Sequence, residues 1–67
     1  MLKIVHNGYD ISYVSSQVEV DTYINTILSK YPDLTPRKII DDKTKNYRLI
    51  VYEYRTLYQE VFMIFKD

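Results

Sequence analysis

Two short runs of alternating apolar and polar residues open the chain, over residues 2–6 and 9–14, and Asn7-Gly8 separates them. Asn-Gly between two such runs is a strong hairpin signal because both residues tolerate the positive φ of a type I′ turn. A two-residue loop would place Ile4 opposite Ile11. That register predicts a core face made of Leu2, Ile4, His6, Tyr9, Ile11 and Tyr13.

The next segment repeats apolar residues at spacings of three and four, which is typical of one face of a helix. The repeat comprises Val20, Tyr23, Ile24, Ile27, Leu28 and Tyr31. Ser16 and Glu19 fit a capping box at its start. Pro32 ends the pattern because the residue before a proline disfavours the α region. We therefore expect a helix over residues 17–31.

Three further strands are expected after the helix. Residues 37–41 form a short strand candidate, with an irregular segment as the alternative, and a polar turn follows over residues 42–46. Residues 47–54 and 58–66 are rich in β-branched and aromatic side chains, which favour strands. The turn over residues 55–57 contains neither Gly nor Pro, so its register stays open.

The order ββαβββ predicts one small α+β domain over residues 1–67. It would consist of an N-terminal β-hairpin, one α-helix and then a three-stranded antiparallel segment. A single amphipathic helix can pack on only one face of this sheet. The other face would then lack a cover from within the chain.

Both faces of the last two strands are apolar, although strands with one wet face should alternate. If the turn over residues 55–57 forms a three-residue loop, Leu49, Val51, Val61 and Met63 make one aliphatic face. We expect the helix to cover this face, since its own stripe is rich in Ile and Leu. Exposed apolar patches mark interaction sites, and Tyr and Arg are enriched at binding hot spots. The opposite face therefore gives the predicted partner-binding residues, which are Lys38, Arg48, Tyr52, Tyr54, Tyr58 and Phe62.

Composition narrows the class of protein. Eight tyrosines and no alanine fit strand propensity, and they also fit an AT-rich genome, which together with the short length is common among phage and virus genes. The absence of Cys excludes a disulfide scaffold. No apolar run approaches the about 18 residues of a membrane span, and no signal peptide is recognisable, so we expect a cytoplasmic protein. Small domains without disulfides or a structural metal are marginally stable, and oligomerisation can stabilise them. A homodimer is therefore a reasonable hypothesis.

Catalytic and metal chemistry is not indicated. His6 is the only histidine and is interpreted as a half-buried strand residue rather than a general base. Gly8 is the only glycine, so no phosphate-binding loop is available. The segment at Asp41-Asp42 lacks the Gly and the final Glu of a calcium loop. We expect no catalytic residue, no metal site and no cofactor, and therefore not an enzyme.

The expected function is a small non-catalytic protein-binding domain. Its composition favours a phage- or virus-type modulator or inhibitor that binds a host protein through the Tyr-rich sheet face. The alternative is single-stranded nucleic-acid binding on the same face, because sheet aromatics can stack bases. Nine basic and nine acidic residues give a net charge of zero, which weighs against this alternative. Its additional phosphate contacts would come from Arg37, Lys43, Lys45 and Arg55.

Overall fold

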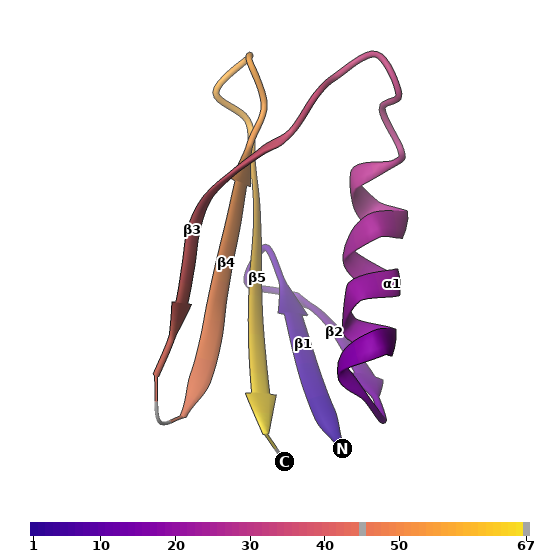
Figure 1. Ribbon diagram of the computed structural model, residues 1–67, viewed down its shortest axis with the longest axis vertical. Helices are drawn as coiled ribbons and strands as arrows, with labels where there is room; N and C mark the ends of the chain where they lie inside the picture. The colour runs from indigo at the N-terminus through magenta and orange to yellow at the C-terminus, as the bar shows by residue number, and fades with distance from the viewer. Residues whose placement is uncertain (45, 67) are drawn as a thin grey trace.

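A computed structural model describes residues 1–44 and 46–66 of the chain. Lys45, predicted in the polar turn and as a phosphate contact, lies outside the described residues. The expected ββαβββ order and the α+β class are confirmed (Figure 1). The elements are β1 (Leu2–His6), β2 (Asp10–Val14), α1 (Gln17–Leu28), β3 (Arg37–Lys43), β4 (Tyr47–Glu53) and β5 (Gln59–Lys66).

The strands form one five-stranded sheet in the order β2-β1-β5-β4-β3. Every neighbouring pair is antiparallel. The strands after the helix, β3, β4 and β5, are antiparallel neighbours, as in the predicted three-stranded segment. Because β5 also pairs with β1, this segment and the N-terminal hairpin belong to a single sheet. Figure 1 shows the two chain ends close together, where β1 and β5 lie side by side.

The β1–β2 hairpin turns at Asn7 and Gly8, which have φ values of 53° and 83°. Its predicted register is wrong by one residue, because Tyr9 also stays in the loop and His6 pairs with Asp10. Asn7 continues the β1–β5 ladder past the end of the β1–β2 ladder. Its N–H donates to the Val61 carbonyl at 2.7 Å, and its side-chain oxygen accepts from the Val61 N–H at 2.8 Å.

This one-residue shift turns β2 over, because successive strand residues point to opposite faces. Ser12 lies opposite Ile4, and Ile11 lies opposite Val5. The prediction that Tyr9, Ile11 and Tyr13 belong to the core face is therefore wrong: all three are exposed, and Val14 packs against the core in their place.

Helix α1 begins at the predicted cap. The Ser16 side chain accepts a hydrogen bond from the Glu19 N–H. The helix ends at Leu28, earlier than predicted. The Ser29 N–H still donates four residues back, to the Asn25 carbonyl at 3.0 Å, but the Lys30 N–H donates only three residues back, to the Ile27 carbonyl at 3.2 Å, so the chain leaves the α-helix in a tighter turn. Within the described residues, no helix has the length and apolar character needed to cross a membrane.

The apolar stripe of α1 packs on β1, β4 and β5. The buried cluster consists of Ile4, Val20, Ile24, Ile50, Phe62 and Ile64. The prediction that α1 covers the face of Leu49, Val51, Val61 and Met63 is therefore wrong. The cause is the pairing of β1 with β5: Ile4 lies directly opposite Ile64, and cross-strand partners share a face. Ile4 and His6 of β1 therefore lie on the same sheet face as Phe62 and Ile64 of β5, and this is the face that the helix covers.

The remaining strand predictions are confirmed. Residues 37–41 belong to β3, which carries a bulge between Lys38 and Ile40. The strand continues to Lys43, so the predicted polar turn over residues 42–46 starts two residues too early. The β4–β5 hairpin closes with the three-residue loop, since the Tyr54 N–H donates to the Tyr58 carbonyl at 2.9 Å. Leu57, the last loop residue, has a φ of 67°.

Candidate binding surfaces

The six predicted partner-binding residues share one sheet face, but it is the face under α1. Phe62 is 0% exposed and Tyr54 is 1% exposed, so neither can meet a partner. Phe62 packs edge-on against Tyr52 at 6.2 Å between ring centroids, and Tyr54 stacks on Tyr58 at 5.7 Å. The prediction of an uncovered Tyr-rich face is wrong, because these aromatic rings belong to the interior of the domain or to its rim.

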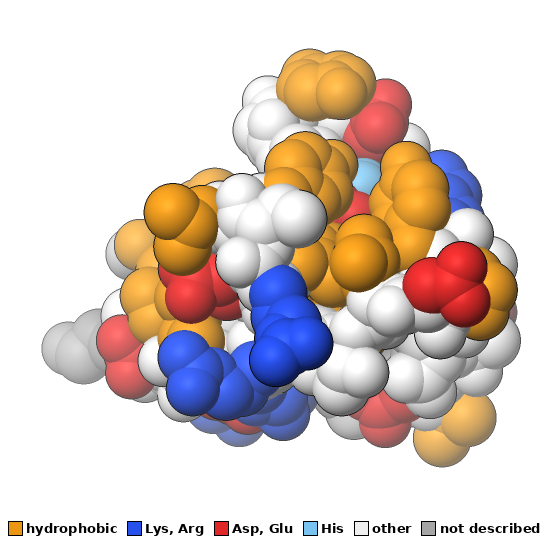
Figure 2. Space-filling model, turned by 90° about the horizontal axis from the view of Figure 1, so that it is seen from above, with side chains coloured by type: hydrophobic (Ala, Val, Ile, Leu, Met, Phe, Trp, Pro, Cys, Tyr) orange, Lys and Arg blue, Asp and Glu red, His pale blue; other side chains and the backbone are white. Residues whose placement is uncertain are grey.

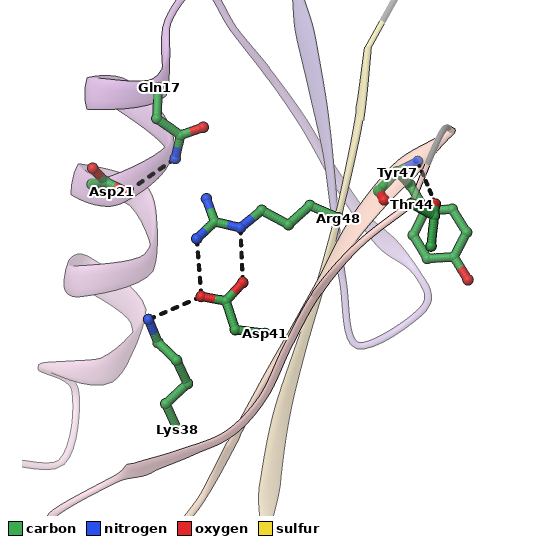
Figure 3. Close-up of polar contacts among 7 residues, drawn as sticks. All are labelled: Gln17, Asp21, Lys38, Asp41, Thr44, Tyr47 and Arg48. Carbon is green, nitrogen blue, oxygen red and sulfur yellow. Dashed lines mark hydrogen bonds and ion pairs between the residues drawn. The ribbon is translucent and has the colours of Figure 1, made fainter.

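Arg48 and Lys38, the two basic residues of the predicted site, bind a carboxylate of the same chain (Figure 3). Arg48 donates from Nε and Nη2 to the two oxygens of Asp41, at 2.9 and 3.0 Å. Lys38 Nζ donates to the same carboxylate at 3.3 Å and lies 5.9 Å from the Tyr52 ring centroid. The hydrogen bonds from Arg48 are the main reason that the pKa of Asp41 lies below its ordinary value. Lys38 and Arg48 are therefore paired with Asp41, whereas the nucleic-acid alternative needs their positive charges to bind phosphate groups.

The opposite sheet face is apolar along three rows that cross the strands. Directly paired residues of neighbouring strands point to the same side, so each row can be read from the register. The middle row is Ile11, Val5, Met63 and Leu49. The second row is Tyr13, Lys3, Phe65 and Tyr47. The third row is Val61, Val51 and Ile40. We call these eleven residues the open face.

Side chains of the open face shield one another, and Val51 is only 5% exposed, but no helix or second sheet lies over this face within residues 1–44 and 46–66 (Figure 1). Ile11 and Tyr13 are more than half exposed, at 55% and 57%. Phe65 packs against Tyr47 with 5.5 Å between ring centroids, and Lys3 Nζ lies 5.5 Å from the Phe65 centroid. The face is thus aliphatic in its middle and third rows and aromatic in its second.

A buried carboxylate on the helix side was not anticipated from the sequence. Glu60 is 3% exposed, and its Oε1 lies 2.6 Å from Nε2 of the buried His6. The Asn7 side-chain amide donates to the same oxygen at 3.0 Å. His6 also stacks on Phe62, with 4.8 Å between centroids and 11° between planes. His6 was correctly expected on the core face, but nothing near it in the chain identifies a partner that is 54 positions away.

Tyr54 and Tyr58 are close enough to this carboxylate for its charge to affect their hydroxyl groups. Tyr54 stacks on Tyr58 and meets Tyr31 edge-on at 6.4 Å between centroids. The charge of Glu60 is the main cause that raises the pKa of Tyr58, whereas burial is the main cause for Tyr54, with Glu60 second. We call Glu60, His6, Asn7, Tyr31, Tyr54 and Tyr58 the Glu60 cluster.

Figure 2 views the molecule from the end where α1 finishes and the β4–β5 loop turns. The histidine is visible in a depression between hydrophobic side chains, with a carboxylate beside it. No group of three or more His, Asp or Glu side chains that could hold a metal ion occurs in the described part of the chain. The Glu60 cluster therefore offers one carboxylate, one imidazole and several phenol groups.

The fold and these surfaces define a small α+β domain with one helix on a five-stranded antiparallel sheet. The chain matches no protein-family model, and no curated protein or solved structure is significantly similar to it. Function must accordingly be inferred from the open face and the Glu60 cluster themselves.

Proposed function

We propose that this chain is a small non-catalytic protein-binding domain that packs its open face against a partner protein. The observation that carries the proposal is the continuity of the apolar rows across the sheet, with no covering layer in the described part of the chain. Antiparallel strands with a wet face normally alternate apolar with polar residues, and a contiguous exposed apolar surface usually marks an interaction site.

The open face has the size of the apolar centre of such an interface. Strands about 4.8 Å apart and same-face residues about 7 Å apart along a strand give each residue about 34 Å², so the eleven residues of the open face cover about 370 Å². A stable protein–protein interface covers about 600–1,000 Å² on each partner. Polar residues on the same sheet face, such as Asp42 opposite Leu49 and Glu53 opposite Gln59, would have to form the rim of the interface.

The more specific part of the proposal is a phage- or virus-type modulator or inhibitor that acts on a host protein in the cytoplasm. It rests on chain length and composition, namely eight tyrosines and no alanine in 67 residues, which fit an AT-rich genome. The open face supplies the means, because occluding a surface of the host protein needs contact area and no catalytic group.

A second candidate function is single-stranded nucleic-acid binding. The observation in its favour is the row in which Tyr13, Phe65 and Tyr47 lie across the strands with Lys3 among them. Aromatic side chains on a sheet can stack bases. Lys3 is the only basic residue in the three rows, so the proposal for a protein partner takes precedence.

The test uses Met63, the centre of the middle row. Wild-type chain, Met63→Asp and Thr26→Asp are each immobilised and exposed to host lysate, and captured proteins are quantified by mass spectrometry. Thr26 is an exposed helix residue and serves as the control. We expect a protein that the wild type and Thr26→Asp enrich and that Met63→Asp loses, while circular dichroism shows all three folded. Equal capture by folded Met63→Asp contradicts the proposal, and capture of a labelled oligonucleotide that falls steeply with salt supports the second candidate.

A further inference from the structure

We propose that the Glu60 cluster is a binding site for an ammonium group, presented by a lysine side chain or by a free alkylamine. The cluster lies on the helix side of the sheet and is independent of the open face. An ammonium group carries one positive charge and three hydrogen-bond donors on a compact atom. The cluster offers what such a group requires, which is a carboxylate, additional oxygen acceptors and aromatic ring faces.

The oxygen acceptors come from three side chains. The hydrogen bonds that Glu60 receives from His6 and Asn7 both fall on Oε1, so Oε2 has no donor among the described residues. The Tyr54 hydroxyl is buried and is also without a hydrogen-bond partner in this part of the chain. A buried polar atom normally has a partner, and leaving one unpaired costs free energy. An ammonium group at this point can donate to Glu60 Oε2, to the Tyr54 hydroxyl and to the Tyr58 hydroxyl.

The ring faces add attraction for a cation and provide the entrance. Tyr54 and Tyr58 are stacked with 20° between their planes, and Tyr31 is perpendicular to Tyr54 at 88°. Tyr31 and Tyr58 are about half exposed, at 48% and 49%, so the rim of the site is reached from solvent. An alkylammonium group that lies over a ring face is attracted to it by the cation–π interaction. The depression seen in Figure 2 lies at this end of the domain.

The charges around the site favour an organic cation over a metal ion. Glu60 and Asp10 are the carboxylates near His6, and Asp10 lies 3.9 Å from its Nδ1. This set falls short of the three or more ligand side chains that a metal site needs, and the described residues hold no such group. His6 approaches Oε1 alone, which leaves Oε2 for a ligand cation.

The experiment is a titration followed by ¹H–¹⁵N NMR, with methylammonium chloride, tetramethylammonium chloride and sodium chloride at equal ionic strength. We expect saturable shifts of the Asn7, Tyr58 and Glu60 amide signals with methylammonium, and no saturable shift with sodium. Tetramethylammonium has no N–H donor, so we expect it to bind at least tenfold more weakly. Linear shifts with every salt overturn the site, and equal binding of tetramethylammonium overturns the hydrogen-bonded geometry.

Two matched tyrosine variants test the assignment without disturbing the core. Tyr58→Phe removes one acceptor and should weaken methylammonium binding about tenfold, as expected for one hydrogen bond to a charged group. Tyr13→Phe removes a hydroxyl of similar exposure on the open face and should leave binding unchanged. Glu60→Gln should abolish binding. If that variant does not fold, the Tyr58→Phe and Tyr13→Phe pair decides, and equal affinities for these two overturn the proposal.

A last arm identifies the source of the ammonium group. Nα-acetyl-lysine N-methylamide presents the same group on a peptide-like stem. Tighter binding than methylammonium assigns the site to a lysine side chain of a partner protein. Equal or weaker binding assigns it to a free alkylamine.

Discussion

The imidazole of His6 and the carboxylate of Glu60 form a buried contact of 2.6 Å between the first and last strands of the sheet. Asn7 donates to the same carboxylate oxygen and also bonds to the backbone of Val61. These contacts fasten the β1–β2 turn to β5. Because both partners are buried, each is costly to leave alone, whereas removing both together is not.

Glu60→Leu should destabilise the domain by about 3 kcal/mol, because it leaves the buried His6 and the part-buried Asn7 amide without an acceptor. His6→Phe/Glu60→Leu should recover most of that loss, since Phe keeps a ring stacked on Phe62 and Leu fills the carboxylate's volume. Urea denaturation of the wild type, both single variants and the double variant completes the thermodynamic cycle. A double variant whose loss equals the sum of the single losses contradicts the coupling.

Phe62→Ala and Phe65→Ala test which sheet face the helix covers. Phe62 is in the buried cluster, and its truncation should cost about 3–5 kcal/mol through lost burial and a cavity. Phe65 lies on the open face against Tyr47 and is only half-buried, so its truncation should cost about 1 kcal/mol. Both variants delete the same atoms from the same strand. Equal losses in urea denaturation, or a larger loss for Phe65→Ala, would mean that the helix packs on the other face.

Local sequence patterns were sufficient to predict the types of the elements. The stripe from Val20 to Leu28 gives the helix, Ser16 caps it, and the β-branched runs give the strands. His6 was placed correctly on the core face because it shares a strand period with Ile4. Each of these features depends on residues within a few positions of one another.

The faces could not be predicted in the same way, because they depend on long-range pairing. Both faces of β4 and β5 are apolar, so their alternation does not show which one meets the helix. The pairing with β1 determines which face the helix covers, because Ile4 lies opposite Ile64 near the other end of the chain. The six-residue partner site depended on that choice and was therefore placed on the covered face. The register of β2 was wrong for a related reason, since Asn7 is held by Val61.

Asp41 should make the domain less stable in acid. Its folded pKa is lowered from 3.8, chiefly by hydrogen bonds from Arg48, so folding favours the ionised carboxylate. This contribution is fully present above pH 4 and is lost as the pH falls through the folded pKa. The side chain is 31% exposed, and solvent screening limits the effect to about 0.5–1 kcal/mol.

Asp41→Asn should accordingly lose this increment at pH 6 and match the wild type more closely at pH 2.5. Arg48→Met should behave in the same way, because it removes the other half of the pair. Urea midpoints at the two pH values provide the measurement. A difference between Asp41→Asn and wild type that is the same at both pH values contradicts the assignment.

Leu57→Gly should stabilise the domain. Leu57 has a φ of 67°, in the left-handed region, where a side chain costs about 1–2 kcal/mol relative to glycine. The residue is 76% exposed, so replacing it removes little buried apolar surface. The greater freedom of glycine in the unfolded chain offsets part of the gain, which leaves an expected net increase in stability of about 0.5–1 kcal/mol.

Thr56→Gly is the matched control in the same loop. Thr56 is not among the positive-φ residues, so glycine there should destabilise the domain by about 0.5–1 kcal/mol. Thermal unfolding of both variants checks the sign, and a loss of stability in Leu57→Gly comparable to that in Thr56→Gly would place residue 57 outside the left-handed region.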